Sequence, residues 1–540
     1  MEIRLSDPTA ATHPRFSTAL GCVEWLQTVP LINVAPSQGR VLEEVEAINA
    51  SDIEADERLK IFECLLDAIN FLQSELARKF VGHAVPLGPQ EQQILDTVVA
   101  LWMLLGAGYR RCFDAFSERR LTGRRQSLAI ALQRSLWCVA QALNEHRKCH
   151  QAPPAGLWSG LYETFVLAER FDVSLEPVAS PVPKAGGPTH CMSTLAQAVL
   201  LDASSANELT ARQIAVTARW LDRWSAKVLI RSWVDADRDA NAPREPLVID
   251  LLADRGPSRV RAEPAAPSLR VVETGELSKS LRKRAALLCK GESPLSLGLG
   301  NDVSPQFAES LLQGLHRTWC EDRRPRNVSR RAAAEGCGLS AGMGSIHFHL
   351  TGTPFHQPIR STEFGKIQHD EIATFGRVST HKATTSAQEV PSALEAWSIV
   401  DESPAGLRIA RISGESRFLH SQLVAVKAGN TPSFLLGTVR WLAVDRMRAT
   451  RIGLRLLPGS PQGVSIRAAG INGQKDKFVP ALLLGAVPPL HAPETLVLPV
   501  GWFKPERLVQ VAGNDALWEA RLTGLLDRGC DYERITFELA

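Results

Sequence analysis

The chain has 540 residues, of which 44% are apolar and 22% are charged. A chain of this length is expected to form about three or four domains, and the composition is typical of ordinary globular protein. Its 61 basic and 58 acidic residues give a formal net charge of only +3. This near balance argues against a protein whose surface broadly coats nucleic acid, so we expect no nucleic-acid partner.

The cysteines and the apolar stretches indicate a cytoplasmic protein without a membrane span. None of the ten cysteines forms a C-x-x-C pair, and most lie in apolar, helix-like stretches, as expected for reduced thiols. The first residues, Met1–Pro8, contain no apolar signal-peptide core. The longest uncharged apolar stretch, Thr97–Tyr109, is shorter than the roughly 20 residues that span a bilayer.

Apolar residues recur at helical spacing through most of residues 1–235. Ser51 with Glu54, and Ser205 with Glu208, match the capping-box pattern that starts a helix. The predicted helices are Gly39–Ala50, Leu59–Phe80, Glu91–Phe116, Arg124–His150, Leu157–Phe171, Thr189–Leu201 and Leu209–Val234. We therefore predict an α-helical domain over residues 1–235, formed either as a bundle or as a superhelical stack.

Residues 236–320 resemble a connecting region. Two short strands are predicted at Leu247–Leu252 and Leu269–Thr274, and two helices at Leu277–Cys289 and Gln306–Cys320. We expect this region to link the helical half to the C-terminal half.

The period of the apolar residues changes after residue 320. Short β-rich stretches separated by turn residues predict strands from Ser345–Leu350 to Arg534–Leu539, which is typical of a barrel or sandwich. We predict an antiparallel β-barrel over residues 321–472, with a polar insertion at 351–392. Residues 473–540 are predicted to form a C-terminal β extension or a second small β module. The expected fold class is thus multidomain α + β.

Two motifs in this half carry side chains suited to phosphate and guanine. Arg326 and Arg330 form R-x-x-x-R within a cluster that also contains Arg323 and Arg324. Asp401, Ser403 and Gly406 form D-x-S-x-x-G between two predicted strands. Guanidinium groups bind phosphate oxygens or the O6/N7 edge of guanine in a two-pronged manner, whereas Asp and Ser can bond guanine N–H groups. Glycine permits a close backbone approach or a positive φ.

These motifs, in this order, resemble the signature of the PilZ domain, a small β-barrel that binds cyclic di-GMP. The flanking strands Trp397–Val400 and Leu407–Ile409, and the later Leu436–Trp441 and Ile452–Leu457, are similar to the strands of that family. The resemblance covers roughly residues 320–470. It implies a non-enzymatic receptor that binds cyclic di-GMP through Arg326, Arg330, Asp401, Ser403 and Gly406, with Arg323 and Arg324 contributing at the rim.

The spacing of the motifs departs from the family. Arg330 and Asp401 lie 71 positions apart, against a few tens in PilZ domains, and the polar segment at 351–392 accounts for the difference. Because barrels of this kind can lose the ligand and keep the fold, the alternative is a helical scaffold or chaperone-like interaction protein. In either case we expect an unidentified protein partner to bind the helical half.

Three further patterns in the sequence contain residue types found in metal sites or at nucleophiles. His146, Cys149 and His150 share a helical face, and His347 and His349 share the face of a predicted strand, but neither group has the ligand set of a metal site. Ser340 lies in a G-x-S-x-G match, but the expected order of elements around it does not suit a nucleophile elbow. We therefore expect no catalytic residue, no metal and no cofactor.

Overall fold

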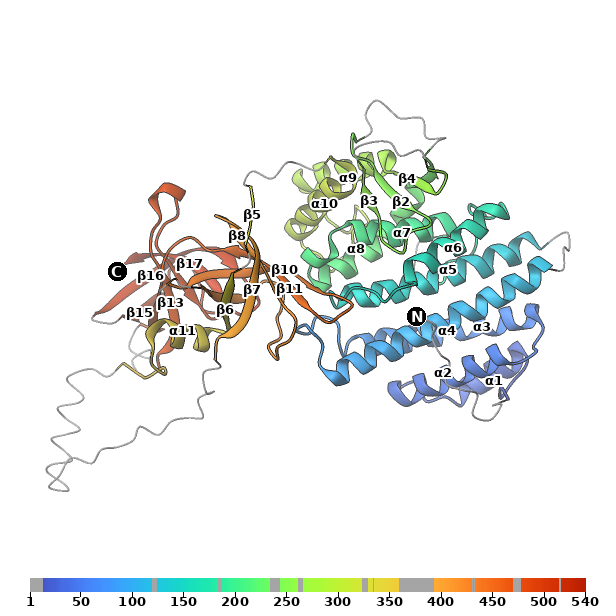
Figure 1. Ribbon diagram of the computed structural model, residues 1–540, viewed down its shortest axis with the longest axis horizontal. Helices are drawn as coiled ribbons and strands as arrows, with labels where there is room; N and C mark the ends of the chain where they lie inside the picture. The colour runs from blue at the N-terminus through green and yellow to red at the C-terminus, as the bar shows by residue number, and fades with distance from the viewer. Residues whose placement is uncertain are drawn as a thin grey trace, which may run out of the picture. The chain divides into compact units, whose positions relative to one another are not determined.

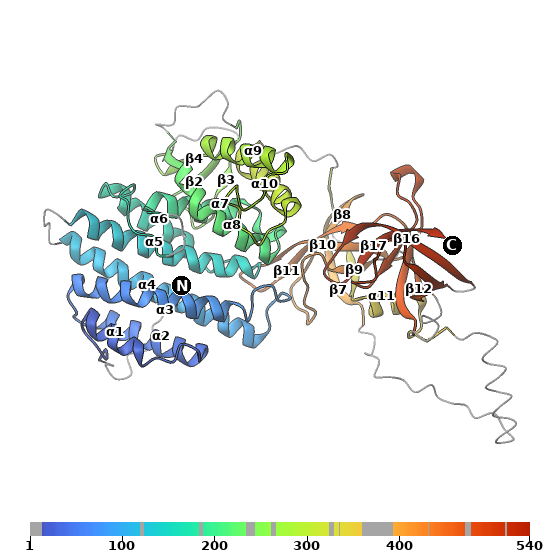
Figure 2. The same ribbon diagram turned by 180° about the vertical axis from the view of Figure 1, so that it is seen from behind.

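The computed structural model of the protein divides into two compact units (Figures 1 and 2). The first unit comprises Met1–Pro325 with Ala443–Arg446, and the second comprises Arg326–Leu442 with Met447–Ala540. The structure describes residues 13–118, 124–182, 187–233, 243–260, 266–322, 329–333, 335–358, 393–429, 431, 433–469, 477–513 and 516–540. Every helix within these ranges lacks the apolar length needed to cross a bilayer.

Eight α-helices form most of the first unit. They are α1 (Ala19–Gln27), α2 (Val34–Ala50), α3 (Ala55–Ala77), α4 (Pro89–Glu118), α5 (Arg125–Lys148), α6 (Leu157–Arg170), α7 (Cys191–Ala203) and α8 (Ala211–Trp224). The extensive contacts join helices that are one or two apart in the chain. This pattern is that of a stack, in which each helix packs on its sequence neighbours, rather than of a bundle closed around one core.

Two predicted helix starts are wrong. Helix α3 begins at Ala55, and the Ser51 hydroxyl instead donates to the carbonyl of Ile48, 2.8 Å away, at the end of α2. The capping box before α8 is made by Thr210 and Gln213, not by Ser205 and Glu208. Both true and false matches contain a short polar residue three positions before a longer one, so the pattern alone could not separate them.

The helix predicted over Leu209–Val234 is also too long. Helix α8 ends at Trp224, and β1 (Leu229–Ser232) follows within that range. Strand β1 pairs with β4 (Leu269–Glu273), and β4 also pairs with β2 (Leu247–Asp250). Strand β3 (Ser258–Arg259) pairs with β2 and completes a four-stranded antiparallel sheet in the order β1-β4-β2-β3. Trp233, Val248 and Leu269 form its apolar core.

The region predicted as a linker is packed on the helical stack. Its helices are α9 (Gly275–Cys289) and α10 (Pro305–Cys320). The indole N–H of Trp319 in α10 donates to the carbonyl of Leu200 in α7 over 2.8 Å, and Trp220 in α8 donates in the same way to Leu299. Residues 243–322 therefore share the first unit with the helices, as far as the structure describes them.

The second unit contains two closed barrels of six antiparallel strands each. The first is built from β6 (Gly336–Ala341), β7 (Glu395–Ser403), β8 (Gly406–Arg411), β9 (Leu423–Ala428), β10 (Leu435–Val444) and β11 (Thr450–Leu456). The order is β7-β6-β9-β10-β11-β8, and the pairing of β8 with β7 closes the ring. A short strand, β5 (Arg331–Ala332), pairs with the end of β7 beside β6. The predicted barrel is confirmed, and residues 359–392 of the predicted insertion lie outside the described residues.

The strand predicted at Ser345–Leu350 is wrong, because this stretch lies in helix α11 (Met343–Thr351). The strand that completes the barrel is β6, immediately before it. The alternation of Ile346, Phe348 and Leu350 imitates a strand, yet Gly342 at φ 86° breaks the chain direction and starts a helix. His347 and His349 consequently do not share a strand face.

The second barrel is formed by β12 (Pro461–Ala468), β13 (Val479–Leu484), β14 (Thr495–Leu498), β15 (Leu508–Ala512), β16 (Leu517–Arg528) and β17 (Glu533–Leu539), in the order β12-β13-β14-β17-β16-β15. Strand β12 belongs to this barrel, so the boundary that we expected near residue 472 lies instead between β11 and β12. Residues of both barrels and of α11 share one apolar core, to which Leu423, Leu436, Leu482 and Tyr532 contribute.

Candidate functional site

The D-x-S-x-x-G motif forms the hairpin between β7 and β8. Ser403 and Gly406 are cross-strand partners on either side of the turn residues Pro404 and Ala405, and the Ser403 hydroxyl donates to the Gly406 carbonyl over 3.1 Å. A Cβ atom at Gly406 would collide with the carbonyl oxygen of Leu454 in β11. Glycine is therefore required here by a close approach of two strands, and not by a positive φ.

A β-bulge turns Asp401 toward the candidate site. Ile399 pairs with Ile409 and Asp401 pairs with Arg408, so β7 has one extra residue, Val400, at this point. Ile399 and Ile409 are buried inside the barrel. In a regular strand, residues two positions apart share a face, so Asp401 would lie on the buried face of Ile399. The bulge places it on the opposite face, beside Arg408.

Arg330 and Arg408 converge on the Asp401 carboxylate. Arg330 precedes β5, which pairs with β7 in the register Arg331 with Glu402 and Ala332 with Asp401. The Arg330 guanidinium donates to Asp401 Oδ1, while Arg408 Nη2 lies 2.7 Å from Asp401 Oδ2. Only 13% of the Asp401 side chain is exposed, against 26% for Arg330 and 43% for Arg408. Two cations thus share one shielded anion, which leaves the described part of the site positively charged.

Arg408 also keeps an unused donor. Its Nε atom is buried and has no hydrogen-bond partner among the described residues. A buried N–H group of this kind costs free energy unless water or a ligand accepts from it. The neighbouring Arg331 is bonded to Glu402, and this bond raises the pKa of Arg331 above its usual value.

Trp441 extends the site along the barrel surface. Gly453 in β11 is the cross-strand partner of Arg408, and a Cβ atom at Gly453 would collide with the indole ring of Trp441. The ring therefore lies over Gly453, one strand away from Arg408, and stays half-buried. Our sequence prediction did not include Trp441. The sequence feature that could have indicated it is a tryptophan in one strand and a glycine in the next strand, because the indole ring can cover the space above a glycine, which has no side chain.

The structure brings four of the seven predicted site residues to one corner of the first barrel. These residues are Arg330, Asp401, Ser403 and Gly406. The other three, Arg323, Arg324 and Arg326, lie outside the described residues. The arginine segment and the hairpin motif thus meet in space where Arg330 reaches Asp401.

The alternative sites lie elsewhere. Helix α11 follows β6, so the order of elements that we predicted around Ser340 is wrong, and a strand and a helix do flank it. Ser340 itself is buried within the strand, not at the turn, and its hydroxyl is 2.9 Å from that of Ser345. Burial lowers the pKa of His347 and lowers that of His146 to about 4.

The described residues contain no cluster of His, Cys, Asp or Glu that could hold a metal ion. All ten cysteines are free. Burial raises the pKa of Cys112 and of Cys191 to about 12, which makes both thiols poor nucleophiles.

A closed six-stranded barrel with an arginine held at a D-x-S-x-x-G hairpin defines a PilZ-like protein. Two family models match the chain: "Cyclic-di-GMP receptor FimW, N-terminal domain" at residues 21–235 and "FimW C-terminal beta-barrel domain" at residues 464–540. The chain therefore carries, at residues 21–235 and 464–540, domains similar to the two that these FimW models describe.

A curated relative agrees with this assignment along nearly the whole chain. The cyclic-di-GMP receptor FimW of Pseudomonas aeruginosa is 22% identical over 533 aligned residues, which cover 90% of this chain and 85% of the relative. No solved structure matches the chain. The first matched domain corresponds to the helical stack up to β1, and the second corresponds to the second barrel.

Proposed function

We propose that the protein is a non-enzymatic receptor for cyclic di-GMP whose binding site is the corner formed by Arg330 and the β7–β8 hairpin. The observation that carries the proposal is the bond between Arg330 and Asp401, which joins the two halves of the PilZ signature. The printed name of the Pseudomonas relative, a cyclic-di-GMP receptor, supports the same ligand.

The geometry suits an anionic purine ligand. Arg330 and Arg408 can each present a planar pair of N–H donors to a phosphate oxygen pair or to guanine O6/N7. Asp401 fixes both guanidinium groups before the ligand arrives, so less rotamer entropy is lost on binding. The Trp441 indole offers a flat face on which a guanine can stack, and it covers Gly453, the cross-strand neighbour of Arg408.

The remaining predicted residues complete the proposal. Arg326 is expected to grip the ligand with Arg330, while Arg323 and Arg324 increase the local positive charge and speed the encounter. Ser403 and Gly406 shape the turn, and the Ser403 hydroxyl can exchange its bond with the Gly406 carbonyl for one with guanine.

The second barrel provides a route from this site to the rest of the second unit. Arg455 is the cross-strand partner of Gly406, and its guanidinium pairs with Asp527 in β16. Asp527 also accepts a 3.0 Å hydrogen bond from Tyr532, which belongs to the shared core. We propose that ligand binding at the hairpin is relayed through this network, and that the helical stack recognises a protein partner.

Isothermal titration of the full chain with cyclic di-GMP tests the proposal, with cyclic di-AMP and GMP as comparison ligands. We expect saturable binding of cyclic di-GMP, and weaker binding of the other two because they lack either the guanine edge or the second guanine and phosphate. If the folded chain binds none of them at about 100 μM, a concentration that reveals even weak affinity, a helical scaffold with a barrel that does not bind nucleotide replaces the receptor.

The proposal also includes the absence of catalysis. Asp401 is the carboxylate at the centre of the described site, and both of its oxygens face arginines, so it is held as an ion-pair partner and not as a base. Cyclic di-GMP incubated with the chain and Mg²⁺ or Mn²⁺ should be recovered unchanged by chromatography. Protein-dependent formation of the linear dinucleotide would show that the protein is an enzyme.

A further inference from the structure

The first unit includes a short piece of the chain's second half. Ala443–Arg446 belongs to it, whereas Leu442 before this piece and Met447 after it belong to the second unit. Residues 443 and 444 are also the last two residues of β10, the strand of the first barrel that carries Trp441. One unbroken strand therefore begins in the second unit and ends in the first. We call residues 443–446 the anchor segment.

Backbone hydrogen bonds attach the anchor segment to the connection between α5 and α6. The Val444 N–H donates to the His150 carbonyl, and the Ala152 N–H donates to the Val444 carbonyl, each over 2.8 Å. Val444 thereby forms a parallel bridge with Gln151, and only 3% of Val444 is exposed. Because a buried N–H or carbonyl without a partner costs free energy, displacing Val444 from these bonds is unfavourable.

The Arg446 side chain extends the attachment to the start of α6. Its Nε donates to the Pro153 carbonyl over 2.8 Å, and its Nη2 lies 3.4 Å from Asp254 Oδ2. Asp254 in turn accepts hydrogen bonds from the backbone N–H groups of Gly156, over 3.0 Å, and Ser159, over 3.2 Å. The first N–H groups of a helix have no partner within the helix, so Asp254 caps α6 and Arg446 pairs with the cap.

The same connection also contacts α4. The Gln151 side chain donates through Nε2 to Gln92 Oε1, over 2.9 Å, in the first turn of α4. The start of α4, the end of α5 and the start of α6 are therefore all close to the anchor segment along short chains of hydrogen bonds. A shift of this segment would change the surroundings of three helix ends at once.

Trp441 and Val444 are only three residues apart in β10. Three residues of a strand span about 10 Å, and an extended backbone has little slack to absorb a displacement. Leu442, between them, is 1% exposed, so the surrounding side chains hold this part of the strand on both sides. A change in the position of the Trp441 backbone is therefore passed on to the hydrogen-bonding groups of Val444.

We propose that the anchor segment couples the cyclic di-GMP site to the helical stack. A guanine stacked on Trp441 holds β10 in the position in which Val444 and Arg446 bond to the connection between α5 and α6. This inference rests on the proposed function, because it takes Trp441 as part of the ligand site. The network of Arg455 and Asp527 lies within the second unit, so it cannot replace this link to the first. Such coupling is reciprocal, and the ligand strengthens the attachment by the factor by which the attachment strengthens ligand binding.

Hydrogen–deuterium exchange of the full chain, with and without saturating cyclic di-GMP, measures the attachment. The amide groups of Val444 and Ala152 are the donors of its two backbone bonds, so their exchange rates report its opening. We expect both amides to exchange about fivefold more slowly, or slower still, with the ligand bound. Trp441→Ala at saturating ligand should not show this slowing. Equal exchange rates with and without bound ligand would overturn the inference.

Replacement of Arg446 by alanine tests the coupling from the other side. We expect the variant to bind cyclic di-GMP about fivefold more weakly or worse, although Arg446 belongs to the first unit. The matched control is Arg448→Ala, which removes an exposed arginine two positions further along, in the second unit, and should bind as the unaltered chain does. Circular dichroism checks that both variants are folded. An unchanged affinity of Arg446→Ala, or equal weakening by Arg448→Ala, would overturn the inference.

Calorimetric titration of the unaltered chain separates this inference from the proposed function. Binding of cyclic di-GMP that leaves the exchange of Val444 and Ala152 unchanged overturns only the coupling, and the receptor proposal stands. If the folded chain does not bind the nucleotide, the receptor proposal fails and the coupling fails with it.

Discussion

Arg330 is bonded to Asp401, although 71 positions separate the two residues in the chain. The pairing of β5 with the end of β7 brings their backbones together, and the extra residue Val400 turns the carboxylate toward the guanidinium. The distance between the motifs in the sequence therefore does not separate the two halves of the site, because β5 and β6 both pair with β7. What the sequence presented as a departure from the PilZ pattern is compatible with a PilZ-like arrangement.

Replacement of Arg330 by alanine should weaken cyclic di-GMP binding by about tenfold or more. A charge-assisted hydrogen bond contributes roughly 1.5–3 kcal/mol, and 1.4 kcal/mol corresponds to a factor of ten. Arg330→Lys should recover only part of the affinity, because an ammonium group lacks the planar pair of donors. Titration calorimetry at two salt concentrations measures both variants.

The matched control for this substitution is Arg317→Ala. Arg317 is an exposed arginine at the end of α10, outside the barrel unit. Its loss should leave the affinity unchanged, and circular dichroism should show that all the variants are folded. If Arg317→Ala weakened ligand binding as much as Arg330→Ala, Arg330 would contribute only its positive charge and no specific contact.

Asp401→Ala should weaken binding in a different way. Removing the carboxylate frees Arg330 and Arg408 from their shared partner, so the guanidinium groups lose their fixed orientation while the site becomes more positive. We expect lower affinity at physiological salt, but a salt dependence at least as steep as that of the unaltered chain. An affinity that does not change would mean that Asp401 neither orients the arginines nor contacts the ligand.

Gly406→Ala should destabilise the barrel by about 1–3 kcal/mol, because the new methyl group forces β8 away from the Leu454 carbonyl. Chemical unfolding of the second unit measures this cost. Gly344→Ala in α11 is the control, since a Cβ atom there meets nothing within 4 Å, and it should be neutral or slightly stabilising. Equal stability of the two variants would show that the strands separate without strain.

The sequence predicted the barrels well because their strands are short, alternating and separated by turn residues. The prediction failed where the spacing of apolar residues fits a helix and a strand equally well. Residues 345–350 alternate like a strand, but Gly342 starts a helix; Leu229–Ser232 continues the apolar pattern of α8, but forms a strand. The end of β11 and the start of β12 likewise look like neighbours in one sheet, and only the three-dimensional pairing assigns β12 to the other barrel.

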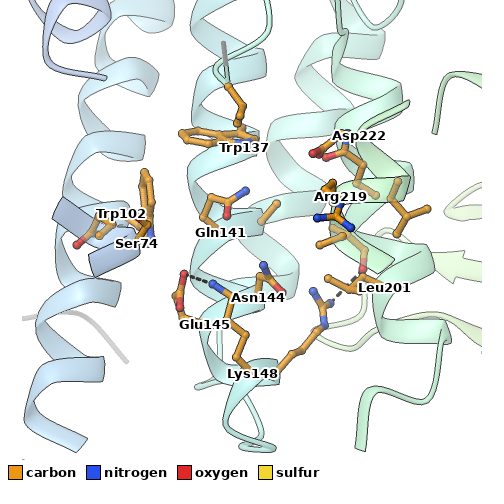
Figure 3. Close-up of a pocket in the computed structure, with 18 of the residues that line it drawn as sticks. Ser74, Trp102, Trp137, Gln141, Asn144, Glu145, Lys148, Leu201, Arg219 and Asp222 are labelled. Carbon is orange, nitrogen blue, oxygen red and sulfur yellow. Dashed lines mark hydrogen bonds and ion pairs between the residues drawn. The ribbon is translucent and has the colours of Figure 1, made fainter. Parts of the chain in front are cut away.

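The site was predictable where residue type alone determines the chemistry. Arginine, aspartate and the hairpin glycine could be identified from the motifs, whereas the bulge at Val400 and the position of Trp441 over Gly453 depend on strand register. The pocket whose lining includes residues of α3, α4, α5, α7 and α8 (Figure 3) could not be predicted, because these residues lie far apart in the sequence.

The stability of the first unit should depend on Asp254 as pH falls. Partial burial opposes ionisation, but hydrogen bonds from the backbone N–H groups of Gly156 and Ser159, the charge of Arg446 and a bond from Trp158 hold the pKa of Asp254 below its usual value. A lowered pKa means that the unfolded chain binds the proton first. The contribution of Asp254 is therefore complete above the unfolded pKa of about 3.9 and is lost as the pH falls through the folded value.

The comparison of the unaltered chain with Asp254→Asn tests this linkage. Asparagine keeps an acceptor for the start of α6 but has no charge, so the variant should be less stable at pH 6 by about 0.5–1 kcal/mol. The difference should shrink as the pH falls below about 3.9, because the aspartate is then protonated as well. A difference that stays constant with pH would show that Asp254 acts through its shape and not its charge.

Trp441→Ala should weaken cyclic di-GMP binding by about five- to tenfold or more, because base stacking on an aromatic ring contributes roughly 1–3 kcal/mol. Trp441→Phe should keep most of the affinity, since phenylalanine retains a flat face that can cover Gly453. The control is Trp518→Ala in the second barrel, where the indole packs on Phe537 at 5.3 Å. Calorimetric titration of the three variants, with chemical unfolding alongside, separates stacking on the ligand from support of the barrel. If Trp441→Ala lowers stability but binds the nucleotide normally, the indole only fills the space above Gly453.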